Sequence, residues 1–204
     1  VTVPAAIDAW RQLNRDYGNL DLGELLTPAI NYARDGYPIS SRVSLDFAMC
    51  QDLLKKDANL ARVFMPNGKT LDVGELHHQP ELARTMQQVA ENGREAFYTG
   101  ELAEDMVGYL QSLGGLHTME DFANSVGDYV SPISTNFRDH TVWECPPNGQ
   151  GVIALLLLNI MSGFKTEGVD PLSVYRLHQE IEAGRLAYRD RNIFVADPTQ
   201  ADVP

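Results

Sequence analysis

The stretch that decides the fold runs from His140 to Met161 and reads HTVWECPPNGQGVIALLLLNIM. Its first residues, through Cys145, are mostly β-branched, aromatic or small, which predicts a strand ending at Pro146. Residues 147–151 predict a rigid turn, because proline fixes φ and glycine can adopt positive φ. Residues 152–161 are apolar on nearly every face, which predicts a helix that is buried on all sides.

We call residues 146–151 the elbow, because they connect the predicted strand to the predicted helix. The backbone amides of the elbow precede a helix N-terminus, where N–H groups can bind an anion or a carbonyl oxygen. A plain tight connection between a strand and a helix gives the same pattern. Spacing alone leaves both interpretations open.

The composition is that of a globular protein. The chain has 204 residues, of which 44% are hydrophobic and 22% charged. A net charge of −12 disfavours binding to nucleic acid or to an anionic membrane surface. The longest apolar run, residues 152–161, is far shorter than the roughly 20 residues of a membrane span. The sequence does not begin with Met, so we expect a fragment whose localisation stays unknown.

Hydrophobic spacing predicts a mainly α fold with a small antiparallel β-hairpin between Tyr129 and Cys145. Pro28 predicts a kink or break within the second helix, and Leu71 to Leu76 is expected to be extended. The longer helices are expected between Pro4 and Gly18, Asp21 and Gly36, Ser40 and Lys56, Pro80 and Gly93, Glu101 and Leu113, and Leu172 and Phe194.

Several residues invite a chemical interpretation but have a simpler one. Cys50 and Cys145 are too few for a disulfide framework and lack metal-type spacing, so we expect two small buried hydrophobes. A nucleophilic Cys145 is the alternative, although no base is marked beside it. His77 and His78 resemble a metal pair, but adjacent residues point to opposite sides and no third ligand is near. We expect two polar loop histidines there.

The last predicted helix carries further candidates. His178 and Glu182 share a helix face, as two metal ligands could, and we expect a surface pair. Arg185, Arg189, Asp190 and Arg191 predict a salt-bridged face, with an anion clamp as the alternative. The sequence therefore predicts no metal site.

A set of short motifs, in order along essentially the whole chain, resembles one family. Each motif alone is weak, but the ordered set is specific to the γ-glutamyltransferase (γ-glutamyltranspeptidase) family. The motifs are Val3–Pro4 with Trp10, Tyr17–Gly18, Leu25–Ile30, Ala33–Ile39, Gln79–Thr85, Gly93–Gly100, Glu120–Asp121, Val130–Pro132, Pro146–Pro147 with Gly149 and Gly151, Leu158–Ile160, Glu182–Arg191 and Asp197–Pro198.

The resemblance implies an N-terminal-nucleophile hydrolase, made as a precursor that cleaves itself into a large and a small subunit. The nucleophile of such an enzyme is the threonine that begins the small subunit, and no cofactor is needed. The present chain is similar to the middle and C-terminal part of the large subunit. We therefore expect residues 1–204 to form a single helical region with no catalytic residue. Its partner would be the remainder of its own precursor, and the substrate a γ-glutamyl amide, as in glutathione metabolism.

The elbow departs from the pattern of many family members, which have serines after the two prolines. Here Asn148, Gly149, Gln150 and Gly151 follow, which is more similar to uncharacterised relatives and to cephalosporin or glutaryl acylases. If this segment reaches the substrate cleft, we expect these four residues to be next to the substrate. The alternative is a non-catalytic helical scaffold or interaction domain, whose apolar surface would favour self-association.

Overall fold

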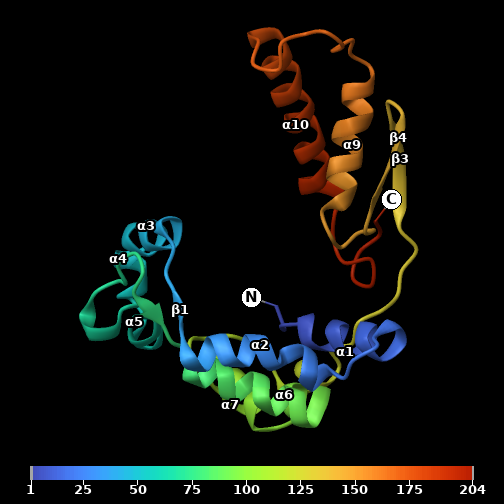
Figure 1. Cartoon of the computed structure of the whole chain (residues 1–204). Coiled ribbons are helices and arrows are strands. Elements are labelled where there is room, and N and C mark those ends of the chain that lie inside the picture. The colour runs from blue at the N-terminus through green and yellow to red at the C-terminus, as the bar shows by residue number, and fades with distance from the viewer. Residues whose placement is uncertain (1, 204) are drawn as a thin grey trace. The chain divides into compact units, whose positions relative to one another are not determined.

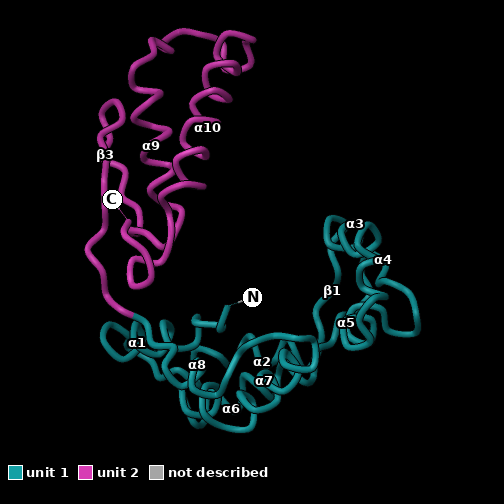
Figure 2. Tube along the Cα trace, turned by 180° about the vertical axis from the view of Figure 1, so that it is seen from behind, with its two compact units in different colours: residues 1–127 teal, residues 128–204 magenta. Residues whose placement is uncertain are grey.

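The structure is a computed structural model that describes residues 2–203, and the chain divides into two compact units (Figure 2). Unit 1 is Val1–Gly127 and unit 2 is Asp128–Pro204. Helices dominate both units, so the predicted mainly α fold with a small antiparallel hairpin is confirmed. That both units join a single helical region in a larger protein stays a prediction.

Unit 1 is a stack of helices with a small lobe inserted between two very short strands (Figure 1). Its elements are α1 (Ala6–Tyr17), α2 (Leu22–Asp35), β1 (Tyr37–Pro38), α3 (Ser41–Met49), α4 (Gln51–Leu54), α5 (Ala58–Phe64), η1 (Pro66–Gly68), β2 (Leu76–His77), α6 (Pro80–Tyr98), α7 (Glu101–Ser112) and α8 (Met119–Ala123). The core of unit 1 forms where α2 packs along α6 and where α7 and α8 cover α6.

Local signals set most helix ends in unit 1. Asp21 caps α2 by accepting a hydrogen bond of 2.8 Å from the Glu24 amide, and Gly36 ends it with a φ of 86°. The helix continues through Pro28, so the break expected there is wrong. The predicted third helix is interrupted at Cys50, which separates α3 from α4. At Gly93, a φ of 65° bends the chain, so the helical run predicted to end there resumes as far as Tyr98.

A buried ion pair fastens this bend to α1. The Arg94 Nε lies 2.9 Å from an oxygen of Asp8, whose side chain is almost fully buried. The second oxygen of Asp8 accepts hydrogen bonds of 2.7 Å from the Gly127 amide and from Gln12. Arg94 also donates to the carbonyls of Ala123 and Ser125, at 2.7 and 3.0 Å. Every oxygen of this buried carboxylate therefore has a partner, as burial of a charge requires.

Further contacts extend the ion pair into a network. The Arg94 guanidinium lies 4.7 Å from the centre of the Tyr98 ring, and the Tyr98 hydroxyl donates to the Pro4 carbonyl at 2.7 Å. Burial by itself would raise the pKa of Asp8, but the hydrogen bonds and the charge of Arg94 lower it below its ordinary value. The carboxylate is thus ionised near neutral pH, and it holds residues 94 and 127 against α1.

The lobe formed by α3 to η1 joins the helical stack through a neck in which β1 pairs with β2. His77 lies on this neck and is only 1% exposed, so its expected place in a polar loop is wrong. The reason is an aromatic cluster: Phe64 stacks on the imidazole at 5.5 Å between ring centres, and Tyr37 and Phe47 meet it edge-on. Its Nε2 atom has no hydrogen-bond partner among the described residues. Burial lowers the pKa of His77, so the ring is neutral.

Unit 2 packs a hairpin and two helices. Its elements are β3 (Ile133–Phe137), β4 (His140–Glu144), α9 (Gly151–Ser162) and α10 (Val174–Phe194). The hairpin register pairs Ile133 with Glu144, and α9 contacts both the hairpin and α10. The prediction that α9 is buried on all sides is wrong within this chain, because Ala154 and Asn159 are exposed. The Asn159 side chain accepts a hydrogen bond from Thr135 of β3.

Candidate functional site: the strand-to-helix elbow

The elbow forms the connection predicted from the sequence. β4 ends at Glu144, residues 147–150 turn, and α9 begins at Gly151. The side chains of Asn148 and Gln150 are exposed, and Asn148 makes no hydrogen bond to any described residue. Gln150 takes the N-cap position of α9, but its side chain makes no capping hydrogen bond. The N–H groups of the first turn are therefore not covered by their own cap.

Gly151 is required by close packing and not by its backbone angles. A Cβ atom at this position would lie 2.7 Å from the Glu144 Cβ and 2.9 Å from the Cys145 carbonyl oxygen. A Cβ atom at Gly149 would meet only an ordinary contact, 3.6 Å from the Pro146 carbonyl oxygen. Neither glycine has a positive φ, so the elbow does not use the freedom to adopt positive φ that glycine offers. The first residue of α9 instead sits directly against the end of β4.

Arg191 holds the elbow from α10. Its Nη1 donates to the Gln150 Oε1 at 3.0 Å, and its guanidinium lies 4.6 Å from the centre of the Tyr188 ring. Two further N–H groups of Arg191 donate to the neighbouring Asn192, at 3.0 and 2.9 Å. Arg191 forms no ion pair with a described carboxylate, so its positive charge stays uncompensated beside the elbow.

The arrangement presents three kinds of donor at one end of α9. These are the free side-chain amide of Asn148, the first backbone amides of α9, and the guanidinium of Arg191 next to Gln150. Such groups suit an acceptor atom with partial or full negative charge, for example a carbonyl or carboxylate oxygen. The sequence singled out Asn148 and Gln150 but missed the contact of Arg191 with the elbow. The only signal was the charged run near the end of α10, 41 residues further along the chain.

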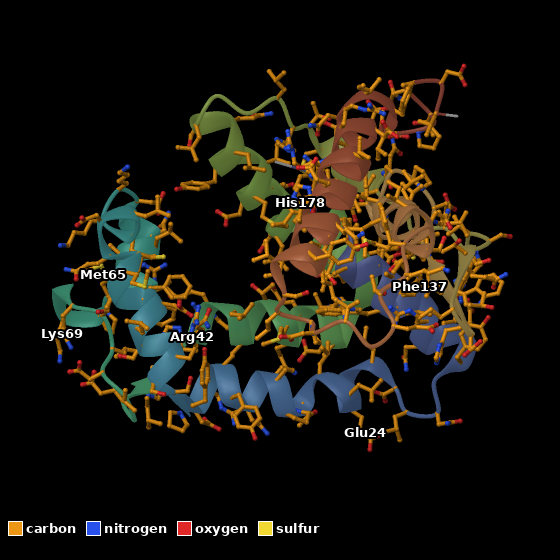
Figure 3. The ribbon with its side chains drawn as sticks, turned by 90° about the horizontal axis from the view of Figure 1, so that it is seen from above. Glu24, Arg42, Met65, Lys69, Phe137 and His178 are labelled. Atoms are coloured by element: carbon orange, nitrogen blue, oxygen red, sulfur yellow. The ribbon has the colours of Figure 1, made fainter. Side chains whose placement is uncertain are left out.

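The other candidate residues do not converge on a second site. Cys50 and Cys145 are both exposed, so the expectation that they are small buried hydrophobes is wrong. His178, labelled in Figure 3 on α10, is exposed. Its expected partner Glu182 pairs instead with Arg185 at 2.7 Å. Arg189 and Asp190 form an ion pair of 2.8 Å, as predicted for a salt-bridged face, whereas Arg191 faces the elbow.

Residues 2–203 contain no cluster of three or more His, Cys, Asp or Glu side chains that could bind a metal ion. In the same part of the chain, none of the helices combines the length and the apolar character that crossing a membrane requires.

Comparison with known families assigns the chain. The profile of the gamma-glutamyltranspeptidase family matches residues 1–204. The chain belongs to the gamma-glutamyltranspeptidase family. The resemblance inferred from the ordered motifs is thereby confirmed, and members of the acylase branch are among the relatives.

Individual relatives show how much of the family's length is present. The chain is 35% identical over its whole length to the glutathione hydrolase-like YwrD proenzyme of Bacillus subtilis, and covers 39% of that protein. Among solved structures, a cephalosporin acylase from Bacillus halodurans is 38% identical with a TM-score of 0.89, and the match covers all of this chain and 39% of that one. A gamma-glutamyltranspeptidase from Helicobacter pylori is 26% identical with a TM-score of 0.88, over 98% of this chain and 58% of that one. The chain thus spans about a third to two fifths of the length of curated relatives it matches.

Proposed function

We propose that the chain is the helical part of a threonine-nucleophile amide hydrolase or acyltransferase, in which the remainder of the precursor supplies the nucleophile. The match to the family over all 204 residues carries this proposal, together with relatives named as glutathione hydrolase and acylase proenzymes. In the proposed reaction the threonine attacks the acyl carbonyl of an amide and the amine leaves. Water or a second amine then releases the acyl group from the enzyme.

The role we propose for this chain is support of the cleft, with the elbow as the part that reaches the substrate. Asn148 and Gln150 would contact polar atoms of the acyl group, while Gly149 would keep the backbone close to it and Gly151 lets α9 begin directly against β4. The geometry supports this role because Gln150 is fixed by Arg191 and the Asn148 amide has no partner within the described residues. A substrate carbonyl or carboxylate oxygen could accept hydrogen bonds from these groups.

Two acyl donors are worth comparing. The identity of 38% with a cephalosporin acylase and the absence of serines after Pro147 favour a glutaryl-type amide. The glutathione hydrolase names among the relatives favour a γ-glutamyl amide. The two acyl groups differ by one amino group, so a single pair of anilide substrates separates them.

The experiment assays the full-length precursor and the 204-residue chain with γ-glutamyl and glutaryl anilides. We expect turnover of at least one anilide by the processed precursor and none by the chain alone. Turnover by the chain alone that is lost when one of its own residues is changed would refute the proposal. A processed precursor that turns over neither anilide would support the alternative of a non-catalytic helical scaffold.

A further inference from the structure

A polar pocket lies in unit 2 at the end of α9 that is opposite to the elbow. Its volume is about 540 Å³, and it is lined by the tip of the hairpin, the last turn of α9 and the segment that follows α9. Phe137, labelled in Figure 3, lies on β3, which packs against α9. The lining residues that the argument uses are Phe137, Arg138, Phe164, Lys165, Thr166 and Glu167.

Arg138 is held in place before any ligand arrives. It occupies the hairpin turn with a φ of 55°, a conformation that residues other than glycine seldom adopt. Its guanidinium lies 5.0 Å from the centre of the Phe137 ring, and one Nη donates to the Thr166 hydroxyl at 2.6 Å. Thr166 is buried, so this contact is fixed on the protein side. A planar guanidinium fixed in this way loses little conformational freedom when it binds an anion.

The pocket holds two cations and one carboxylate, and Glu167 forms no ion pair with either cation among the described residues. Neither Arg138 nor Lys165 forms an ion pair with a carboxylate in the part of the chain that the structure describes. Other exposed arginines of the chain, such as Arg42 and Arg185, do have carboxylate partners. Phe137 and Phe164 add an apolar wall beside the two cations.

We propose that this pocket binds a small phosphate or carboxylate anion that carries an apolar group. Arg138 binds the anion through the N–H groups that Thr166 leaves free, and Lys165 contributes a second positive charge. The rings of Phe137 and Phe164 contact the apolar group. Glu167, on the same wall, repels the anion and limits its affinity.

The pocket has a simpler explanation that the test must separate from binding. Cations near a helix C-terminus are stabilised by the partial negative charge of the last carbonyl groups. If Arg138 and Lys165 served only that purpose, their removal would lower the stability of unit 2 and leave anion binding unaffected. Removal of Glu167 would likewise leave anion binding unaffected.

The test is a titration of the full chain at constant ionic strength, followed by the NMR shifts of backbone amides. The probes are inorganic phosphate, phenyl phosphate and phenylacetate, with sodium chloride as the balancing salt. We expect saturable shifts confined to residues 137–138 and 162–167, with phenyl phosphate binding more tightly than inorganic phosphate. Phenylacetate separates a carboxylate ligand from a phosphate ligand.

Three variants and one control decide the outcome. Arg138→Met should weaken the binding of phenyl phosphate about ten-fold, since it removes a charge-assisted hydrogen bond. Lys165→Met should weaken it about threefold, and Glu167→Gln should tighten it about threefold. The control is Arg189→Met, because Arg189 pairs only with its neighbour Asp190 on α10. Tighter binding of phenyl phosphate by Glu167→Gln cannot result from damage to the fold. The Glu167→Gln measurement therefore tests the proposal even if Arg138→Met is unstable.

The proposal fails if none of the probes gives saturable shifts. It also fails if Glu167→Gln and Lys165→Met both bind phenyl phosphate with the same affinity as the control Arg189→Met. Shifts that follow ionic strength and spread over the whole surface would identify an adventitious ion only.

Discussion

The Asp8 network, which is the set of contacts around Asp8 and Arg94, and the elbow both contain motifs of the same family. Their polar side chains differ in burial and in how many hydrogen-bond partners they have. In the network, the Asp8 carboxylate and the Arg94 guanidinium have partners on α1, on α6 and in the segment before unit 2. In the elbow, among residues 2–203, the Asn148 side chain has no hydrogen-bond partner and that of Gln150 has one, and both side chains are exposed. Saturated, buried polar groups stabilise a fold, whereas exposed and unsaturated ones remain available to a ligand. The segment from Gly93 to Gly100 is therefore a structural motif, and the elbow is the better candidate for function.

The largest effect is expected from breaking the network. Arg94→Met leaves the Asp8 carboxylate buried without its counter-ion and should destabilise unit 1 by about 3–5 kcal/mol. Urea unfolding followed by circular dichroism measures this change. The matched control is Arg42→Met, which removes an exposed pair with Asp46 on α3 and should leave the unfolding midpoint unchanged. Equal midpoints for both variants would contradict the structural role of the network.

The next largest loss of stability is expected at Gly151, where an added side chain would overpack the contact between α9 and β4. Gly151→Ala places a methyl group 2.7 Å from the Glu144 Cβ, so α9 must shift away from β4. Overpacking of this kind should cost unit 2 about 1–3 kcal/mol, measured by thermal unfolding. Gly149→Ala, two residues earlier, meets only an ordinary contact and should change stability by less than about 0.5 kcal/mol. If both glycines tolerate alanine equally, the close approach of α9 to β4 is not needed.

His77 is a buried polar side chain like Asp8, but its Nε2 atom has no hydrogen-bond partner among the described residues. Its pKa is lowered by burial, so between the folded and unfolded pKa values the unfolded state binds more protons. The stability contributed by neutral His77 is complete above about pH 6.5, the ordinary value. It is lost as the pH falls through the lowered pKa. Unfolding midpoints of unit 1 should therefore decrease on acidification from pH 8 to pH 5.

Two variants assign that pH dependence. His77→Phe retains an aromatic ring beside Phe64 and should reduce the loss of stability on acidification. His178→Asn removes an exposed histidine from α10 and should leave the pH profile as in the parent chain. A profile that is unchanged in His77→Phe would show that other groups cause the acid sensitivity.

The sequence predicted those features that depend on neighbours along the chain. Asp21 caps α2 and the elbow joins β4 to α9, as expected. The capping box that Thr118 and Asp121 form at α8 follows the same local rule. These are contacts between residues a few positions apart, for which residue type and spacing are sufficient.

The features that the sequence did not predict depend on tertiary contacts. His77 is buried because rings from Tyr37, Phe47 and Phe64 meet around it, and β1 with only two residues gives no periodic signal. Arg191 was expected on a salt-bridged surface, but packing of α10 against α9 places it beside Gln150. The candidate site was thus half predicted, since its loop was found and its fixed cation was not.

The smallest effect on stability is expected at Asn148. Because this side chain is exposed and makes no hydrogen bond within the described residues, Asn148→Ala should leave the unfolding midpoint of the chain unchanged. In the processed full-length precursor the same change should raise KM for the better anilide about threefold, the effect of one lost hydrogen bond. Gln87→Ala, which removes an exposed amide from α6, is the matched control and should alter neither quantity. A KM that is unchanged by Asn148→Ala would make the elbow a structural connection like the Asp8 network, and the two regions would then differ only in burial.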